Sequence, residues 1–85
     1  MPGLPQRLHK IDAQIGHRLK ELRIRRGLSQ VELGEMLGVT YQQIQKYEKG
    51  ETRLAGSTLW DISKRLDAPI NWYIKGLKKK VPSNK

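Results

Sequence analysis

The sequence predicts an all-α fold of five helices in one small domain. Apolar residues recur every three or four positions along most of the chain, which is the spacing of residues on one face of a helix. Helix-capping residues and glycines separate these periodic segments from one another. A chain of 85 residues suits a single domain, and helical packing with local contacts is the simplest way for it to bury a core.

Composition divides the chain into three parts. Residues 1–10 hold two prolines and a glycine, so we expect a flexible N-terminal arm. Residues 11–76 carry all of the periodic segments and should form the domain. Residues 77–85 offer little to bury and contain a run of lysines, which predicts a basic, disordered tail.

The first predicted helix runs from about residue 12 to residue 26. Its buried stripe is spaced by four, four and three residues and consists of Ile11, Ile15, Leu19 and Leu22. An acidic first turn and a basic last turn, with Asp12 at one end and Arg25 and Arg26 at the other, match the helix dipole. The two arginines either contact phosphate or form a solvated helix end.

The second and third helices are marked by two capping patterns. Ser29 precedes Glu32 by three residues, which is a capping box, and this helix should end at Gly38. Thr40 then precedes Gln43 by the same spacing and opens a third helix that ends at Gly50. A turn of about three residues containing glycine joins the two helices, which is the signature of a helix-turn-helix.

Two further helices follow a loop at residues 51–57. The fourth helix should begin near residue 55 and end at about residue 67, and a short fifth helix should span residues 69–76. The apolar residues expected to fill the core from these helices are Leu59, Ile62, Leu66, Ile70 and Ile74.

The third helix has two chemically different faces. At about 100° per residue, Ile44 and Tyr47 fall on one side. The opposite side presents Tyr41, Gln42, Gln45, Lys46 and Lys49. A glutamine amide matches the N6 and N7 edge of adenine, and lysine donates to guanine or to phosphate. Such a face is suited to the major groove of DNA, although polar helix faces are also common on solvated surfaces.

The overall charge favours the nucleic-acid interpretation. The chain has 17 Lys and Arg against 8 Asp and Glu, a formal net charge of +9 and a pI near 10.2. This excess indicates a polyanionic partner, nucleic acid before an anionic membrane, or else only keeps the protein soluble. Together with the polar face of the third helix, it makes double-stranded DNA the expected partner. Neither a membrane-spanning apolar run nor a signal peptide is present, so we expect a cytoplasmic protein. The absence of cysteine and of any catalytic constellation argues against disulfides, a metal site, a cofactor and an enzyme.

The segment GHRLKELRIRRGLSQVELGEMLGVTYQQIQKYEKGETR resembles the XRE/Cro/cI-type helix-turn-helix family of bacterial and phage regulators, with a lambda-repressor-like fold. The resemblance implies that base edges are contacted by Tyr41, Gln42, Gln45 and Lys46. It implies phosphate contacts for Gln30, Lys49 and Arg53, whereas Gln43 either contacts phosphate or only completes the capping box. It also implies a structural ion pair between Arg23 and Glu48.

Three departures from the family pattern concern the scaffold. Leu54, Ala55 and Gly56 replace the common proline-serine start of the fourth helix, which leaves that boundary open. Gly34 stands where members of the family usually have alanine, at a helix-propensity cost of about 1 kcal/mol. Asp67 replaces the usual glycine after the fourth helix. None of these residues belongs to the predicted DNA-contacting face.

These observations together predict a sequence-specific DNA-binding transcriptional regulator. The simplest such regulator is a repressor, and the family resemblance implies that it binds a palindromic operator as a homodimer, with the fifth helix and the loop before the fourth making the dimer contact. One of Trp60 and Trp72 lies either at that contact or on the surface as a half-buried aromatic. The alternative is an antitoxin that binds a toxin protein and autoregulates its operon.

Overall fold

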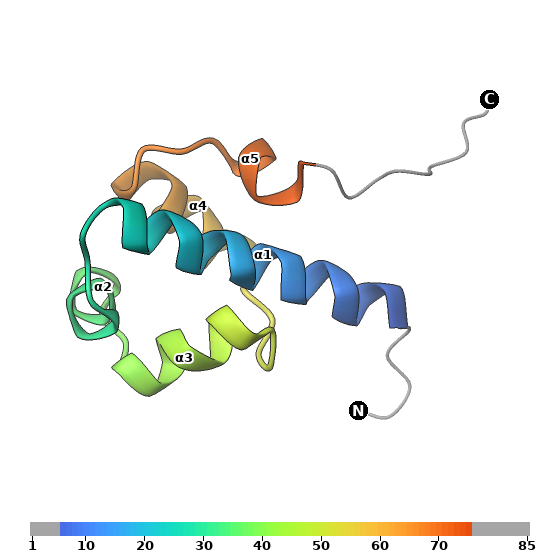
Figure 1. Cartoon of the computed structure of the whole chain (residues 1–85), viewed down its shortest axis with the longest axis horizontal. Coiled ribbons are helices and arrows are strands. Elements are labelled where there is room, and N and C mark those ends of the chain that lie inside the picture. The colour runs from blue at the N-terminus through green and yellow to red at the C-terminus, as the bar shows by residue number, and fades with distance from the viewer. Residues whose placement is uncertain (1–5, 76–85) are drawn as a thin grey trace.

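The computed structural model describes residues 6–75, and all of its regular elements are helices, as the sequence predicts. These are α1 (Gln6–Arg25), α2 (Gln30–Leu37), α3 (Tyr41–Lys49), α4 (Gly56–Arg65) and α5 (Ile70–Ile74). Figure 1 shows α1 crossing the middle of the molecule, with α3 on one side of it and α5 on the other. The predicted basic tail at residues 77–85 and the first five residues of the predicted arm lie outside the described residues.

Helix α1 begins earlier than the sequence predicts. It starts at Gln6 rather than near Asp12, so residues 6–10 are helical and do not belong to a flexible arm. The prolines and the glycine on which the arm prediction rested all precede Gln6. The segment that follows them contains no residue that opposes a helix strongly, and the helix extends through it. None of the described helices is long and apolar enough to span a membrane.

Both predicted N-caps of the helix-turn-helix are present, but only the first is a reciprocal capping box, because the Gln43 side chain does not bond to the Thr40 backbone. The Ser29 hydroxyl accepts a hydrogen bond from the Glu32 backbone N–H at 2.9 Å, and the Ser29 N–H donates to Glu32 Oε1 at 2.8 Å. Thr40 Oγ1 accepts from the Gln43 backbone N–H at 3.1 Å. Between them Gly38 has a φ of 76°, a left-handed conformation that glycine adopts without steric cost. These contacts fix where α2 ends and where α3 begins.

The core corrects one prediction about α5. The buried apolar cluster contains Leu19, Leu22, Leu33, Ile44, Ile62, Leu66 and Tyr73. Ile74, which the sequence placed in the core, is 39% exposed, whereas its neighbour Tyr73 is fully buried. Helix α5 meets the core with the Tyr73 ring, and Trp72 packs partly against the same cluster, so Ile74 lies off the buried face. Burial raises the pKa of Tyr73 to about 12, against the opposing effect of the positive charge on Arg26.

Arg26 has a structural role that neither of the two sequence interpretations included. Its Nε and Nη2 donate to the Leu66 carbonyl at 3.0 and 2.7 Å. Nη2 also donates to the carbonyl of Asp67, which has a φ of 57°. Asp67 thus adopts the left-handed conformation that is easiest for glycine. Arg26 therefore ties the end of α1 to the turn between α4 and α5.

Two glycines allow helices to approach closely at the centre of the fold. A Cβ added to Gly16 on α1 would lie 2.1 Å from the Tyr47 carbonyl oxygen on α3. A Cβ added to Gly34 on α2 would lie 2.6 Å from the carbonyl oxygen of Val39, in the turn before α3. The absence of a side chain at both positions lets α1 and α2 pack directly against the backbone that holds α3.

The close approach at Gly34 gives a stability prediction. Gly34→Ala should lower the free energy of unfolding by about 1–3 kcal/mol, because the overpacking against Val39 exceeds the gain of about 1 kcal/mol in helix propensity. Gly56→Ala is the matched control, since a Cβ there would meet nothing within 4 Å. Urea denaturation measures both variants. If the Gly34→Ala protein is as stable as the Gly56→Ala protein, the backbone near Val39 moves to accommodate the added Cβ without loss of stability.

Candidate nucleic-acid interface

Helix α3 presents the polar face that the sequence predicts. Ile44 is fully buried against the core and Tyr47 is half-buried beside it. Three of the four residues predicted to contact bases are exposed, and these are Tyr41, Gln42 and Lys46. Tyr41, at the first position of the helix, is 44% exposed despite its aromatic ring. The apolar side of α3 thus anchors the helix and leaves its outer side accessible.

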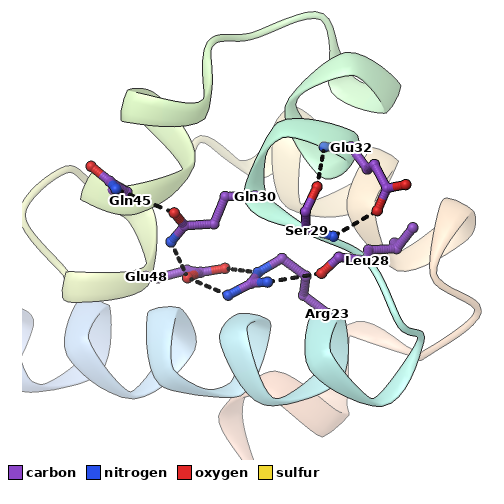
Figure 2. Close-up of polar contacts among 7 residues, drawn as sticks. All are labelled: Arg23, Leu28, Ser29, Gln30, Glu32, Gln45 and Glu48. Carbon is purple, nitrogen blue, oxygen red and sulfur yellow. Dashed lines mark hydrogen bonds and ion pairs between the residues drawn. The ribbon is translucent and has the colours of Figure 1, made fainter.

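A buried ion pair connects α3 to α1. Arg23 Nε lies 2.6 Å from Glu48 Oε2, and Arg23 Nη2 donates to Glu48 Oε1 at 3.2 Å. The side chains are 10% and 3% exposed, respectively. Arg23 Nη1 donates in addition to the Leu28 carbonyl at 2.8 Å, in the loop between α1 and α2 (Figure 2). The pair implied by the family resemblance is therefore present, and it joins α1, α3 and the start of the helix-turn-helix.

Two glutamines extend this pair toward the surface. Gln30 Nε2 donates to Glu48 Oε1 at 3.0 Å, and Gln45 Nε2 donates to Gln30 Oε1 at 3.2 Å. Figure 2 shows these side chains as one chain of contacts that starts at Arg23. Gln45 is consequently half-buried, unlike the other residues predicted to contact bases. Sequence reasoning assigned Gln30 and Gln45 separate roles and missed their contact, because two residues fifteen positions apart share no local pattern.

The residues predicted to contact phosphate lie around the exposed face. Gln43 is half-buried in the first turn of α3, and its backbone N–H, rather than its side chain, bonds to Thr40. Lys49 is exposed in the last turn of α3. Arg53 is exposed in the loop after it, and its Nε lies 3.4 Å from Asp12 Oδ2 on α1. Sequence reasoning placed Asp12 in the first turn of the helix, which is wrong because α1 begins at Gln6, and it missed this ion pair.

The exposed face of α3 suits a polyanion that also carries hydrogen-bonding groups, as the base edges of a nucleic acid do. Exposed amide, phenol and ammonium groups donate and accept hydrogen bonds, and a buried polar network keeps their helix in place. Within the part of the chain that the structure describes, no three histidine, aspartate or glutamate side chains gather as a metal site would require.

The chain is similar to known DNA-binding regulators. A helix-turn-helix family model matches residues 19–73. An uncharacterized transcriptional regulator in the ATPase CF(0) region of Rhodospirillum rubrum is 40% identical over 75 residues, which cover 88% of this chain and 69% of that protein. An uncharacterized helix-turn-helix transcriptional regulator of Sinorhizobium medicae is 48% identical over 63 residues, which cover 74% of this chain and 45% of the relative. The chain thus spans less than half the length of that second regulator.

A solved structure has the same architecture. The P22 c2 repressor, crystallised with a synthetic operator, superposes with a TM-score of 0.67 at 32% identity. The superposition covers 73% of this chain and 94% of the P22 protein. The residues that the family model matches, 19–73, include α2 and α3.

Removal of one partner of the buried ion pair tests its structural role. Glu48→Ala should lower the free energy of unfolding by about 3–5 kcal/mol, because it leaves the Arg23 charge buried without a counter-ion. Chemical denaturation provides the measurement. Glu21→Ala is the matched control, since Glu21 and Arg25 form an exposed pair on one helix, and it should cost no more than about 0.5 kcal/mol. Equal losses in the two variants would contradict the role assigned to the buried pair.

Proposed function

The chain belongs to the helix-turn-helix family of DNA-binding regulators, as the resemblance predicted, and we propose that it is a sequence-specific transcriptional repressor. It binds a palindromic operator as a homodimer, places α3 of each subunit in the major groove and represses by occluding the promoter. The family consists of DNA-binding regulators and not of enzymes, which agrees with the absence of a catalytic constellation in the sequence.

The exposed face of α3 is the observation that carries this proposal. Gln42 and Lys46 project from a helix whose opposite side is held by Ile44 and Glu48. An exposed glutamine offers adenine a donor and an acceptor side by side, and lysine donates to guanine O6 and N7. Tyr41, at the start of α3, is exposed where it would meet a thymine methyl group or a phosphate.

Gln45 contacts a base in a different way from Gln42. Its bond to Gln30 uses one of its two amide N–H donors and leaves its carbonyl oxygen and second N–H for a base edge. Gln30 likewise keeps one N–H for a phosphate after it donates to Glu48. The network holds both amides before DNA arrives, so less side-chain entropy is lost on binding.

Phosphate contacts frame this face. Lys49 and Arg53 lie beyond the C-terminal end of the base-contacting residues, and Gln43 lies in the first turn of α3. Contacts of this kind position the protein on the duplex and carry no sequence information of their own. The P22 c2 repressor, whose structure includes a synthetic operator, provides a comparison for this mode of binding.

The dimer contact is proposed for α5 and for the loop before α4. A shallow, mostly apolar hollow on α5 is lined by Pro69, Asn71, Trp72, Ile74 and Lys75. Trp72 is half-buried there, in edge-to-face contact with Tyr73 at 5.2 Å between ring centroids. Trp60, the other candidate, is 57% exposed on α4. The antitoxin alternative gains no support from the comparisons, since the relatives are named as transcriptional regulators.

Selection of bound duplexes from a random pool, at stated salt, tests the proposal as a whole. The expected result is a two-fold symmetric consensus with half-sites whose centres lie about one helical turn apart. Binding that depends on salt but yields no consensus would contradict sequence-specific repression.

A pair of substitutions separates base contact from phosphate contact. On the selected duplex, Gln42→Ala should cost about 1–3 kcal/mol of binding free energy and relax the preference at one base position. Lys49→Ala should weaken binding to all sequences about equally and reduce the salt slope by about one. Fluorescence anisotropy titrations at several salt concentrations measure both. An unchanged base preference in Gln42→Ala would show that this residue does not contact a base.

A further inference from the structure

Arg53 differs from the other exposed cations near the recognition helix because it has a counter-ion. Its Nε lies 3.4 Å from Asp12 Oδ2, whereas Lys46 and Lys49 take part in no ion pair within the described residues. The Arg53 side chain is 50% exposed, but that of Asp12 is only 14% exposed. A surface arginine is thus held by a carboxylate that is itself largely removed from water.

The backbone around both residues is fixed by packing. Gly50 ends α3 in a left-handed conformation, and a Cβ there would lie 2.7 Å from the Cα of Ala13. The turn after α3 therefore rests on α1 directly beside Asp12. Leu54, the residue after Arg53, packs against the core. Both ends of the Asp12–Arg53 pair consequently start from ordered positions.

The atoms used in the pair leave the phosphate-binding side of the guanidinium available. Asp12 is approached by Nε, while Nη1 and Nη2 of Arg53 donate to no residue in the range that the structure describes. An arginine whose terminal nitrogens are unoccupied can donate both to one phosphate group. If Arg53 turned fully toward DNA, the largely buried Asp12 carboxylate would lose its partner, which is unfavourable.

We propose that Asp12 is a positioning residue for DNA binding, which holds Arg53 through Nε so that Nη1 and Nη2 face a backbone phosphate. This inference rests on the phosphate contact proposed above for Arg53. Asp12 orders a side chain with several rotatable bonds before DNA arrives, and less conformational entropy is lost on binding as a result. Lysine at position 53 would carry the same charge, but its single ammonium nitrogen cannot bond to Asp12 through one nitrogen and to a phosphate through two others, as the planar guanidinium can.

A double-mutant cycle tests the positioning role. The dissociation constant for the selected duplex is measured for the wild type, Asp12→Asn, Arg53→Ala and the double variant. Loss of a negative charge near DNA strengthens binding in any background. We therefore compare the change in dissociation constant that Asp12→Asn causes when Arg53 is present with the change it causes in the Arg53→Ala background. We expect Asp12→Asn to be at least about threefold less favourable when Arg53 is present, because only then is a positioned side chain lost.

Control variants separate positioning from charge and from folding. In an Arg53→Lys background the effect of Asp12→Asn should equal that in the Arg53→Ala background, because lysine lacks the fork. Asp61→Asn with Arg65→Ala forms a matched cycle on an exposed pair of α4 and should show no coupling in DNA affinity. Circular dichroism melts establish that each variant is folded at the temperature of the titration.

The outcomes distinguish this inference from the proposed function. If Arg53→Ala weakens binding and reduces the salt slope but the cycle shows no coupling, the positioning role of Asp12 is wrong and the phosphate contact stands. Coupling of the opposite sign would mean that Asp12 competes with DNA for Arg53, and it would also overturn the inference. If Arg53→Ala changes neither the affinity nor the salt slope, the phosphate contact fails and the inference fails with it.

Discussion

The ion pair between Arg23 and Glu48 is the interaction on which the rest of the DNA-contacting surface depends. It is buried and bidentate, and the remaining arginine nitrogen bonds to the Leu28 carbonyl. Arg23 therefore bonds to the Leu28 carbonyl as well as to Glu48, and Glu48 accepts from Gln30 as well as from Arg23. Additional hydrogen bonds of this kind are the condition under which burial of an ion pair is tolerated. Because Glu48 lies on α3 and Arg23 on α1, the pair fixes the distance and the rotation of one helix against the other.

The glycines of the fold make this arrangement possible. Gly16 brings α1 against the carbonyls of Tyr47 and Glu48, one of which belongs to the ion-paired residue itself. Gly34 brings α2 against the turn before α3. A side chain at either position would push α3 outward and lengthen the contacts of the polar network. The close backbone packing at the two glycines and the polar contacts of the side chains thus both act on α3, and both require the same short distance between α3 and its neighbours.

Local signals in the sequence were sufficient for most of the fold. The capping patterns at Ser29 and Thr40 and the glycine at position 38 predicted the helix-turn-helix because each acts through residues three or four positions apart. Apart from the start of α1, which lies at Gln6 and not near Asp12, most failures concern contacts between distant segments. The Gln30–Gln45 bond, the Arg26 contact with the α4–α5 turn and the Asp12–Arg53 pair all depend on how helices meet in space. At Ile74 the apolar spacing predicted burial, but α5 packs with Tyr73 toward the core instead.

The division of structural and binding roles on α3 has a consequence for specificity. Ile44 and Glu48 hold the helix, so the exposed side chains of Tyr41, Gln42 and Lys46 have no contacts in the core to maintain. If these three residues contact bases as proposed, substitution there changes the preferred base sequence at little cost in stability. Gln45 is different, because its amide is bonded to Gln30 and through it to Glu48. A change at Gln45 would alter both the proposed base contact and the network beneath it, so this position is the most constrained of the four.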